Sequence, residues 1–314
     1  MDPCIHGRLV SAASGDLHPS LYGFRVRTAA DLSFLRLGGG EESIEIDVAT
    51  DTPERPTREP LAEWALRGTS YPARAALYES QHGFEFWTTD TGRFLIEPDR
   101  GRIELPIMED TLLREQRLCG IPMILSYAHR GDFSLHAAAV EVNGGAVLLA
   151  AGSKSGKTTL AFAFHRAGFR VLSEDLVCCR PTSLEVLPGP AVIRLRPDVF
   201  DGSVPTGTSV ARTSPDRLVL SIDQNRRGTS APVPLKGVVF LNEADAISVT
   251  PVAASAVIPS LWNLNFHLPT AADRGKAFRQ LANMAGEVPA WDLYRPLRLD
   301  RLEETVGIIA ALVS

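Results

Sequence analysis

Alternating hydrophobic and polar residues predict that the first third of the chain is rich in β-strands. Apolar residues occupy every second position in 22–26 and in 44–48, as is typical of half-buried strands. Further short strands, separated by turns that contain Gly, Pro, Asp and Thr, are expected at 73–78, 83–88, 93–97 and 102–105. The simplest arrangement of these strands is an antiparallel sheet.

A change of pattern near residue 118 predicts a domain boundary. Leucines repeat at helical spacing over about 109–118, and Pro122 is expected to end or kink this helix. We therefore predict a β-rich α+β amino-terminal domain at 1–118 and a second domain at 119–314. The first domain shows no catalytic constellation, which leaves substrate recruitment, oligomerisation or structural cover as its roles.

The second domain opens with a strand, a tight turn, a second strand, a glycine-rich loop, a helix and a third strand. Asn143-Gly144 lies between two apolar runs and indicates a hairpin, because both central residues of its turn need positive φ. The helix is expected over about 158–167, and Gly168 is expected to end it. A buried strand at 169–172 follows. This alternation predicts an α/β domain with a mixed sheet and covering helices.

The rest of the chain is predicted to complete and cover this sheet. A short buried strand is expected at 238–241, near the centre of the sheet. Two helices are expected at 252–267 and at about 270–284, the second capped by its first residue. Asp300 with Glu303 is expected to open the last helix.

The glycine-rich loop is a candidate phosphate-binding site. It reads Gly152-Ser153-Lys154-Ser155-Gly156-Lys157-Thr158-Thr159. Its small side chains let successive backbone N–H groups turn toward an anion at a helix N-terminus. In a P-loop, the lysine after the last glycine reaches the β- and γ-phosphates of a nucleotide such as ATP, and the next hydroxyl ligates Mg²⁺. These roles fall here to Lys157 and Thr158. The strict pattern places a glycine where this chain has Ala151.

Two carboxylates follow the next strand. Glu174 and Asp175 come just after the strand predicted at 169–172, and the carboxyl ends of strands are where α/β sheets place ligand-facing residues. Such a pair can hold Mg²⁺ together with Thr158, or accept a proton from an attacking hydroxyl. The sequence pattern does not decide which carboxylate binds Mg²⁺ and which one accepts the proton.

Arginines further along the chain are candidate partners for phosphate. Arg194 and Arg196 lie on the same face of a predicted strand, where they either bind an acidic group or form a salt-bridged, solvated edge. Arg226 and Arg227 lie at a predicted turn and either close over a transferring phosphate or belong to the soluble surface.

Composition narrows the functional classes. The 314 residues are 45% hydrophobic, which is enough for a sizeable core, and the net charge of −5 argues against a nucleic-acid partner. The four cysteines show neither metal spacing nor a disulfide framework, so reduced thiols are expected. No apolar run approaches the length of about 18 residues that a membrane span needs, and the start of the chain lacks a signal-peptide pattern. We therefore expect a cytoplasmic protein with no membrane partner. A homo-oligomer is neither required nor excluded.

The order and approximate spacing of His136, the loop at 152–158 and the Glu174-Asp175 pair resemble the catalytic domain of the HPr kinase/phosphorylase family. The segments LHAAAVEVNG, IRLRPD and VPLKGVVFL look more like HPr-kinase-like tailoring enzymes of ribosomally made peptides, including lasso-peptide kinases. The likeness covers about 118–312, and Glu174 stands where the family has an aspartate. The resemblance implies that His136 pairs with the acidic couple and orients it or tunes its proton affinity.

These features lead to one preferred function and two alternatives. The preferred function is an ATP-dependent kinase that transfers the γ-phosphoryl group to a Ser or Thr hydroxyl of a peptide or small protein, using His136, Lys157, Glu174 and Asp175. The alternatives are a kinase for a small hydroxylated metabolite and, because of Ala151 and Glu174, a nucleotide-binding regulator without turnover. An open groove continuous with the amino-terminal sheet favours a peptide acceptor, and a closed apolar pocket favours a metabolite.

Overall fold

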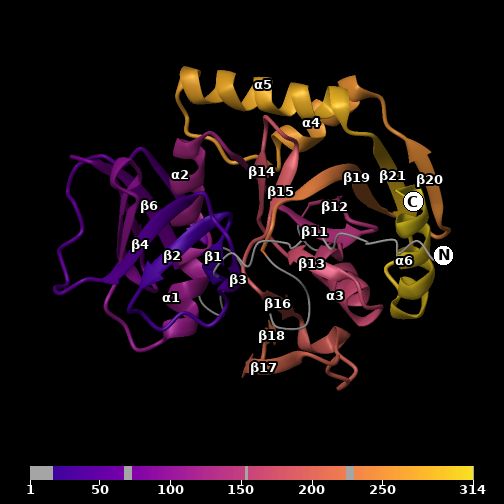
Figure 1. Ribbon diagram of the computed structural model, residues 1–314, viewed down its shortest axis with the longest axis horizontal. Coiled ribbons are helices and arrows are strands. Elements are labelled where there is room, and N and C mark those ends of the chain that lie inside the picture. The colour runs from indigo at the N-terminus through magenta and orange to yellow at the C-terminus, as the bar shows by residue number, and fades with distance from the viewer. Residues whose placement is uncertain (1–16, 67–72, 153–154, 224–229, 314) are drawn as a thin grey trace, which may run out of the picture.

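The computed structural model describes residues 17–66, 73–152, 155–223 and 230–313. Over these ranges the chain is a mixed α/β protein with two large mixed sheets, one small antiparallel sheet and few helices (Figure 1). The amino-terminal sheet lies at one side of the molecule and the second sheet with α3 and α6 at the other, and α5 runs along the top and extends over α2.

Nine strands form the first sheet, in the order β3-β1-β2-β4-β9-β8-β7-β6-β5. They are β1 (His18–Leu21), β2 (Phe24–Thr28), β3 (Arg36–Gly38), β4 (Glu42–Val48), β5 (Ala62–Leu66), β6 (Ala73–Ser80), β7 (Gly83–Thr88), β8 (Gly92–Glu97) and β9 (Arg102–Leu105). Strands β5 to β9 pair antiparallel, as predicted, but β4 is parallel to both β2 and β9. The antiparallel prediction is wrong for β4, because long connections on either side of it allow crossovers.

Two consecutive helices follow the first sheet, α1 (Thr111–Leu118) and α2 (Ile121–Arg130). Pro122 does not end a helix but lies in the first turn of α2, where its missing N–H needs no partner. Met123, Ile124 and Tyr127 of α2 are buried in the core of the first sheet. That core also includes side chains from the second sheet, so the two sheets share packing. The division at residue 118 stays a prediction.

The second sheet has the order β10-β14-β15-β19-β12-β11-β13, with β21 and then β20 continuing from β19. Its strands are β10 (Phe133–Leu135), β11 (Ala137–Val142), β12 (Gly145–Ala150), β13 (Arg170–Ser173), β14 (Val177–Arg180), β15 (Glu185–Leu187), β19 (Val233–Glu243), β20 (Ser248–Pro251) and β21 (Ala290–Arg295). Asn143 and Gly144 have φ of 49° and 76°, which confirms the predicted hairpin turn. Strand β19 is central but longer than predicted, because its first residues also pair with β15.

Helices cover both faces of the second sheet. Alternate residues of β11 and β12 point to two cores, one with α3 (Lys157–Arg166) and α6 (Leu302–Leu312), the other with α4 (Ala254–Trp262) and α5 (Ala271–Glu287). Thr270 caps α5 as predicted, whereas α4 ends at Trp262, earlier than predicted. Asp300 does not cap α6, because Arg298 pairs with its carboxylate. A small sheet of β16 (Val192–Leu195), β18 (Leu218–Ile222) and β17 (Thr208–Thr213) packs against α3.

A buried arginine links the first sheet to the second. Arg36 of β3 donates from Nε to the carbonyl of Gly189 at 2.6 Å and from Nη2 to the carbonyl of Val171 in β13 at 2.8 Å. Burial and the nearby Arg170 lower the pKa of Arg36 to about 10, so the guanidinium stays charged at neutral pH. It therefore holds the segments that flank Ser173 and the acidic pair.

Replacing Arg36 by methionine is expected to lower the free energy of unfolding by about 3 kcal/mol or more, because buried carbonyls lose a charged donor. Urea unfolding followed by circular dichroism measures this. Arg27→Met, at an exposed position of strand β2 in the same sheet, is the control and should stay within about 0.5 kcal/mol of the unmodified protein. Equal stability of the two variants would contradict the linking role.

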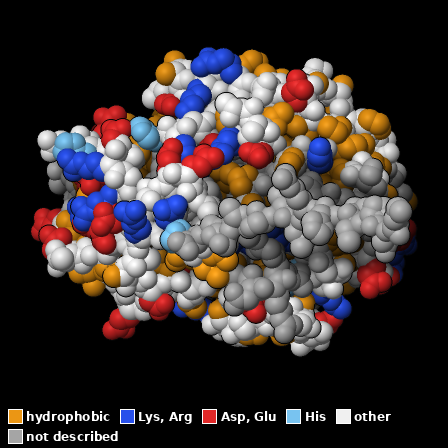
Figure 2. Space-filling view, in the orientation of Figure 1, with side chains coloured by type: hydrophobic (Ala, Val, Ile, Leu, Met, Phe, Trp, Pro, Cys, Tyr) orange, Lys and Arg blue, Asp and Glu red, His pale blue; other side chains and the backbone are white. Residues whose placement is uncertain are grey.

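The surface charges, the helix lengths and the cysteines relate to the expectations about nucleic acid, membranes and disulfides. Basic and acidic side chains are interspersed on the face that Figure 2 shows. No helix within the described ranges is long and apolar enough to cross a membrane. Cys119, Cys178 and Cys179 are free and buried. The expectation of no nucleic-acid partner stays a prediction.

Candidate functional site

The glycine-rich loop joins the carboxyl end of β12 to the start of α3. Strand β12 lies between β11 and the parallel strand β19, so the loop leaves the sheet beside its central strand. Gly156 precedes α3 with φ of 78°, and Lys157 is the first residue of the helix. Gly152 is exposed, whereas Ser155 and Thr159 are half-buried. Four candidate residues lie outside the described residues: Ser153, Lys154, Arg226 and Arg227.

Lys157 turns back onto its own loop. Its Nζ donates to the carbonyls of Ala151 at 2.7 Å and Gly152 at 3.0 Å, and it lies 3.3 Å from Nε2 of His136. These three acceptors match the three N–H groups of an ammonium ion. Burial lowers the pKa of Lys157, and Asp175 and Glu174 oppose this shift.

His136 lies between β10 and β11 and joins the lysine to the acidic pair. Its backbone N–H donates to the carbonyl of Leu264 at 2.7 Å, which holds the main chain in place at this position. Its Nδ1 lies 3.3 Å from Oδ1 of Asp175. Burial lowers the pKa of His136, Asp175 opposes this shift and Lys157 adds to it. In the tautomer whose Nε2 accepts from Lys157, the ring proton lies on Nδ1, the nitrogen that faces Oδ1 of Asp175.

The two carboxylates have different surroundings. Glu174 is buried, with 3% of its side chain exposed, whereas the Asp175 side chain is 49% exposed. Thr158 donates to Oε2 of Glu174 at 2.9 Å, and Nε of Arg194 donates to Oε1 at 2.7 Å. Burial raises the pKa of Glu174, and Arg194 opposes this shift. Glu174 is thus held in place, and Asp175 is open to a substrate.

Of the two arginines predicted on one strand face, only Arg194 belongs to the site. It lies in β16 and also places Nη2 3.5 Å from Oδ2 of Asp175. Burial opposes its charge, but Glu174 and Asp175 outweigh this and raise the pKa of Arg194. Arg196 follows the end of β16, is exposed and pairs with Asp198.

Arg295 contacts the loop and was missed by sequence reasoning. It ends β21, donates from Nη2 to the carbonyl of Ser155 at 3.1 Å, and is only 2% exposed. No strand was predicted there, although Trp, Leu and Tyr between Pro289 and Pro296 favour one. Within the described part of the chain its Nε is buried without a partner.

The donor set at the acidic pair fits Mg²⁺. Thr158, Glu174 and Asp175 bring a hydroxyl and two carboxylates together at the start of α3. The described ranges contain no group of three or more His, Cys, Asp or Glu suited to a metal ion. Mg²⁺ usually binds through one or two carboxylates with substrate phosphates, so it needs no such group.

A cavity of about 210 Å³ opens beside the acidic pair. We call it the carboxylate cavity. His136, Glu174, Asp175 and Arg194 line it together with Leu66 and Phe86 of the first sheet. The half-exposed Asp175 therefore faces a space to which both sheets contribute.

Gly156→Ala is expected to lower the free energy of unfolding more than Gly168→Ala, its matched control. Both glycines have positive φ, of 78° and 94°, where an L side chain costs about 1–2 kcal/mol. An added Cβ at Gly156 would lie 2.7 Å from Nη2 of Arg295, whereas Gly168 has open space within 4 Å. The buried Arg295 would have to release Ser155. Urea unfolding measures the free energy of unfolding of both variants. Equal losses of this free energy would contradict the predicted steric contact between the added Cβ and Arg295.

Comparison with known proteins adds little to this geometry. No family model matches the chain, and no curated protein matches it significantly. Among solved structures, the chain is similar to the Hpr(Ser) kinase/phosphatase from Coxiella burnetii, with 11% sequence identity, a TM-score of 0.27, and coverage of 57% of this chain and 96% of that chain. A likeness this slight carries no conclusion about activity, so the function has to rest on the site itself.

Proposed function

We propose that the protein is an ATP-dependent kinase that transfers the γ-phosphoryl group to an acceptor hydroxyl. One observation carries the proposal. The lysine of a glycine-rich loop is linked through His136 to Asp175 by contacts of 3.3 Å, and a threonine in the first helical turn donates directly to the adjacent Glu174 at 2.9 Å. Phosphoryl transfer depends mainly on such positioning and on electrostatic stabilisation of the phosphates.

The different surroundings of the carboxylates support a division of roles. Lys157 and the backbone N–H groups that begin α3 neutralise the polyphosphate once the lysine leaves its own loop carbonyls. Thr158 and Glu174 would hold Mg²⁺, which would supply neutralisation of charge on the β- and γ-phosphates. Asp175 accepts the proton of the attacking hydroxyl, whose oxygen forms a bond to the γ-phosphorus while the bond from that phosphorus to ADP breaks. His136 orients Asp175 through Nδ1.

The acceptor we propose first is a Ser or Thr residue of a peptide or small protein. The carboxylate cavity is continuous with the first sheet, which supports a role for the amino-terminal part in acceptor binding. The cavity is also small enough for a hydroxylated metabolite, which is the second candidate. The motif order of His136, the loop and the acidic pair supports placement among HPr-kinase-like enzymes, with a precursor of a ribosomally made peptide as a candidate acceptor. We further propose a cytoplasmic location.

Nucleotide binding and turnover test the proposal. The protein is expected to bind a non-hydrolysable ATP analogue in the presence of Mg²⁺ by calorimetry, and to transfer phosphate from ATP to an acceptor, detected by mass spectrometry. Lys157→Met should weaken analogue binding at least about tenfold, the equivalent of about 1.4 kcal/mol. Lys236→Met, at an exposed position of β19, is the control and should not change binding. Analogue binding without any ATP turnover would instead support a non-catalytic regulator.

A further inference from the structure

The carboxylate cavity has a size that limits what can enter it. Its volume is about 210 Å³. Pockets for drug-sized ligands are larger, at about 300–1,000 Å³. The cavity therefore suits one residue-sized group or a small molecule, and the remaining residues of a longer peptide would lie outside it.

One wall of the cavity is apolar. It is formed by Leu66 of β5, Phe86 of β7, and Ile121 and Ile124 of α2. Phe86 is 2% exposed and stacks on Trp64 with ring centroids 6.0 Å apart, so this wall is held by the core of the first sheet. An acceptor that contacts this wall has to carry an apolar group.

The wall contributed by α1 offers hydrogen-bond donors. Arg117 directs Nε and Nη2 to a single oxygen of Asp90, at 3.2 Å and 2.5 Å, and the Asp90 side chain is fully buried. The guanidinium is thereby fixed at the cavity. Gln116 lies beside it, and within the described ranges the structure shows no hydrogen-bond partner for its amide. An oxygen acceptor on the ligand would satisfy this amide.

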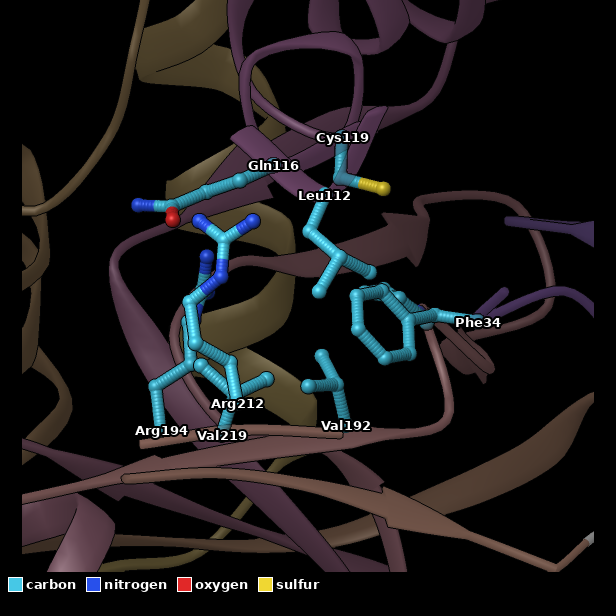
Figure 3. Close-up of a pocket in the computed structure, with 9 residues that line it drawn as sticks. Phe34, Leu112, Gln116, Cys119, Val192, Arg194, Arg212 and Val219 are labelled. Carbon is cyan, nitrogen blue, oxygen red and sulfur yellow. The ribbon is translucent and has the colours of Figure 1, made fainter. Parts of the chain in front are cut away.

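Gln116 also connects the cavity to the small sheet. It lines both the carboxylate cavity and an adjoining pocket of about 20 Å³. Figure 3 shows its amide next to the guanidinium groups of Arg194 and Arg212, which rise from β16 and β17. Arg212 is itself paired with Asp110, and Arg194 with Glu174. Gln116 and Arg194 thus line both spaces.

We infer that the carboxylate cavity binds the acceptor, and that the acceptor is an alcohol with a small apolar group and a carbonyl or carboxylate oxygen. Its hydroxyl lies at Asp175, its apolar group lies against Phe86 and Ile121, and its second oxygen accepts from Gln116 and Arg117. A threonine unit, as a free derivative or as one residue of a peptide, has this chemistry. The inference rests on the proposed kinase function and adds the acceptor class to it.

The probes are N-acetyl-threonine methylamide, the matching serine derivative, glycerol, and a nine-residue peptide with one threonine among alanines. With Mg²⁺ and ATP, the threonine derivative is expected to be phosphorylated with a kcat/KM about fourfold above that of the serine derivative, because it buries one more methyl group. A higher kcat/KM for the peptide than for the threonine derivative would show that the natural acceptor is a residue of a peptide and not a free small molecule. Glycerol lacks both the apolar group and the carbonyl and should not saturate the enzyme. Equal efficiency with glycerol, or transfer to neither derivative nor peptide, would overturn the inference.

Two variants test the walls separately. Gln116→Leu removes the amide, and Ile121→Trp fills the apolar side. Each is expected to raise the KM for the threonine probe at least about tenfold while the affinity for the ATP analogue is unchanged. Their controls are Gln81→Leu and Ile107→Trp, both at exposed positions outside the cavity. An unchanged KM in both cavity variants would reject the acceptor site, whereas failure of the unmodified protein to bind the analogue would reject the kinase function instead.

Discussion

Asp175→Ala is expected to reduce kcat by a factor of about 10²–10⁴ while nucleotide affinity stays within about threefold. Asp175 is the half-exposed member of the acidic pair and borders the carboxylate cavity, so it is the carboxylate that an acceptor hydroxyl can reach. Removing it takes away the proton acceptor. Initial rates of acceptor phosphorylation and calorimetric titration with an ATP analogue measure the two effects.

A second substitution separates proton transfer from positioning. Asp175→Asn keeps an oxygen that can accept from Nδ1 of His136, at 3.3 Å in the structure, but is a far weaker base. It should therefore lose as much kcat as Asp175→Ala. Asp198→Ala breaks an exposed pair with Arg196 and is the matched control, with unchanged kcat expected. Full activity in Asp175→Asn would show that the carboxylate does not take the proton.

Arg194→Met is expected to lower the free energy of unfolding by about 3–5 kcal/mol, because it leaves the charge of Glu174 buried without its partner. Glu174 is 3% exposed and Arg194 is 17% exposed, so solvent screens this pair weakly. Denaturant unfolding measures the loss. Arg196→Met, on the exposed neighbour, should change stability by less than about 0.5 kcal/mol.

The pH dependence of this variant has a defined sign. Burial raises the pKa of Glu174 above its ordinary value of 4.5. A carboxyl group with a raised pKa in the folded state stabilises below its unfolded pKa, and this stability is lost as pH rises through the folded pKa. The defect of Arg194→Met is therefore expected to be smaller near pH 5 than at pH 7. The double variant with Glu174→Gln should recover part of the stability at pH 7. A defect independent of pH would indicate that lost packing, not the uncompensated charge, is the cause.

Local patterns predicted the segment that carries the loop. Local sequence predicted three elements: the Asn143-Gly144 turn, the helix that Gly168 ends, and the strand that leads to Glu174. Each depends on backbone conformations set by only a few neighbouring residues. The first sheet was predicted less well. Its local hairpins were found, but the parallel pairings of β4 were not, because they join segments far apart in the chain.

The sequence by itself determined which chemical groups the site contains: a glycine-rich loop before a helix, a lysine and a threonine at the helix start, and an acidic pair after the next strand. Only the tertiary structure decided how these groups differ. It buried Glu174 against Arg194, left Asp175 open to a cavity, and brought Phe86 and Gln116 to the walls of that cavity. The physical reason is that burial and charge pairing depend on contacts between residues distant in the chain, which no local pattern encodes.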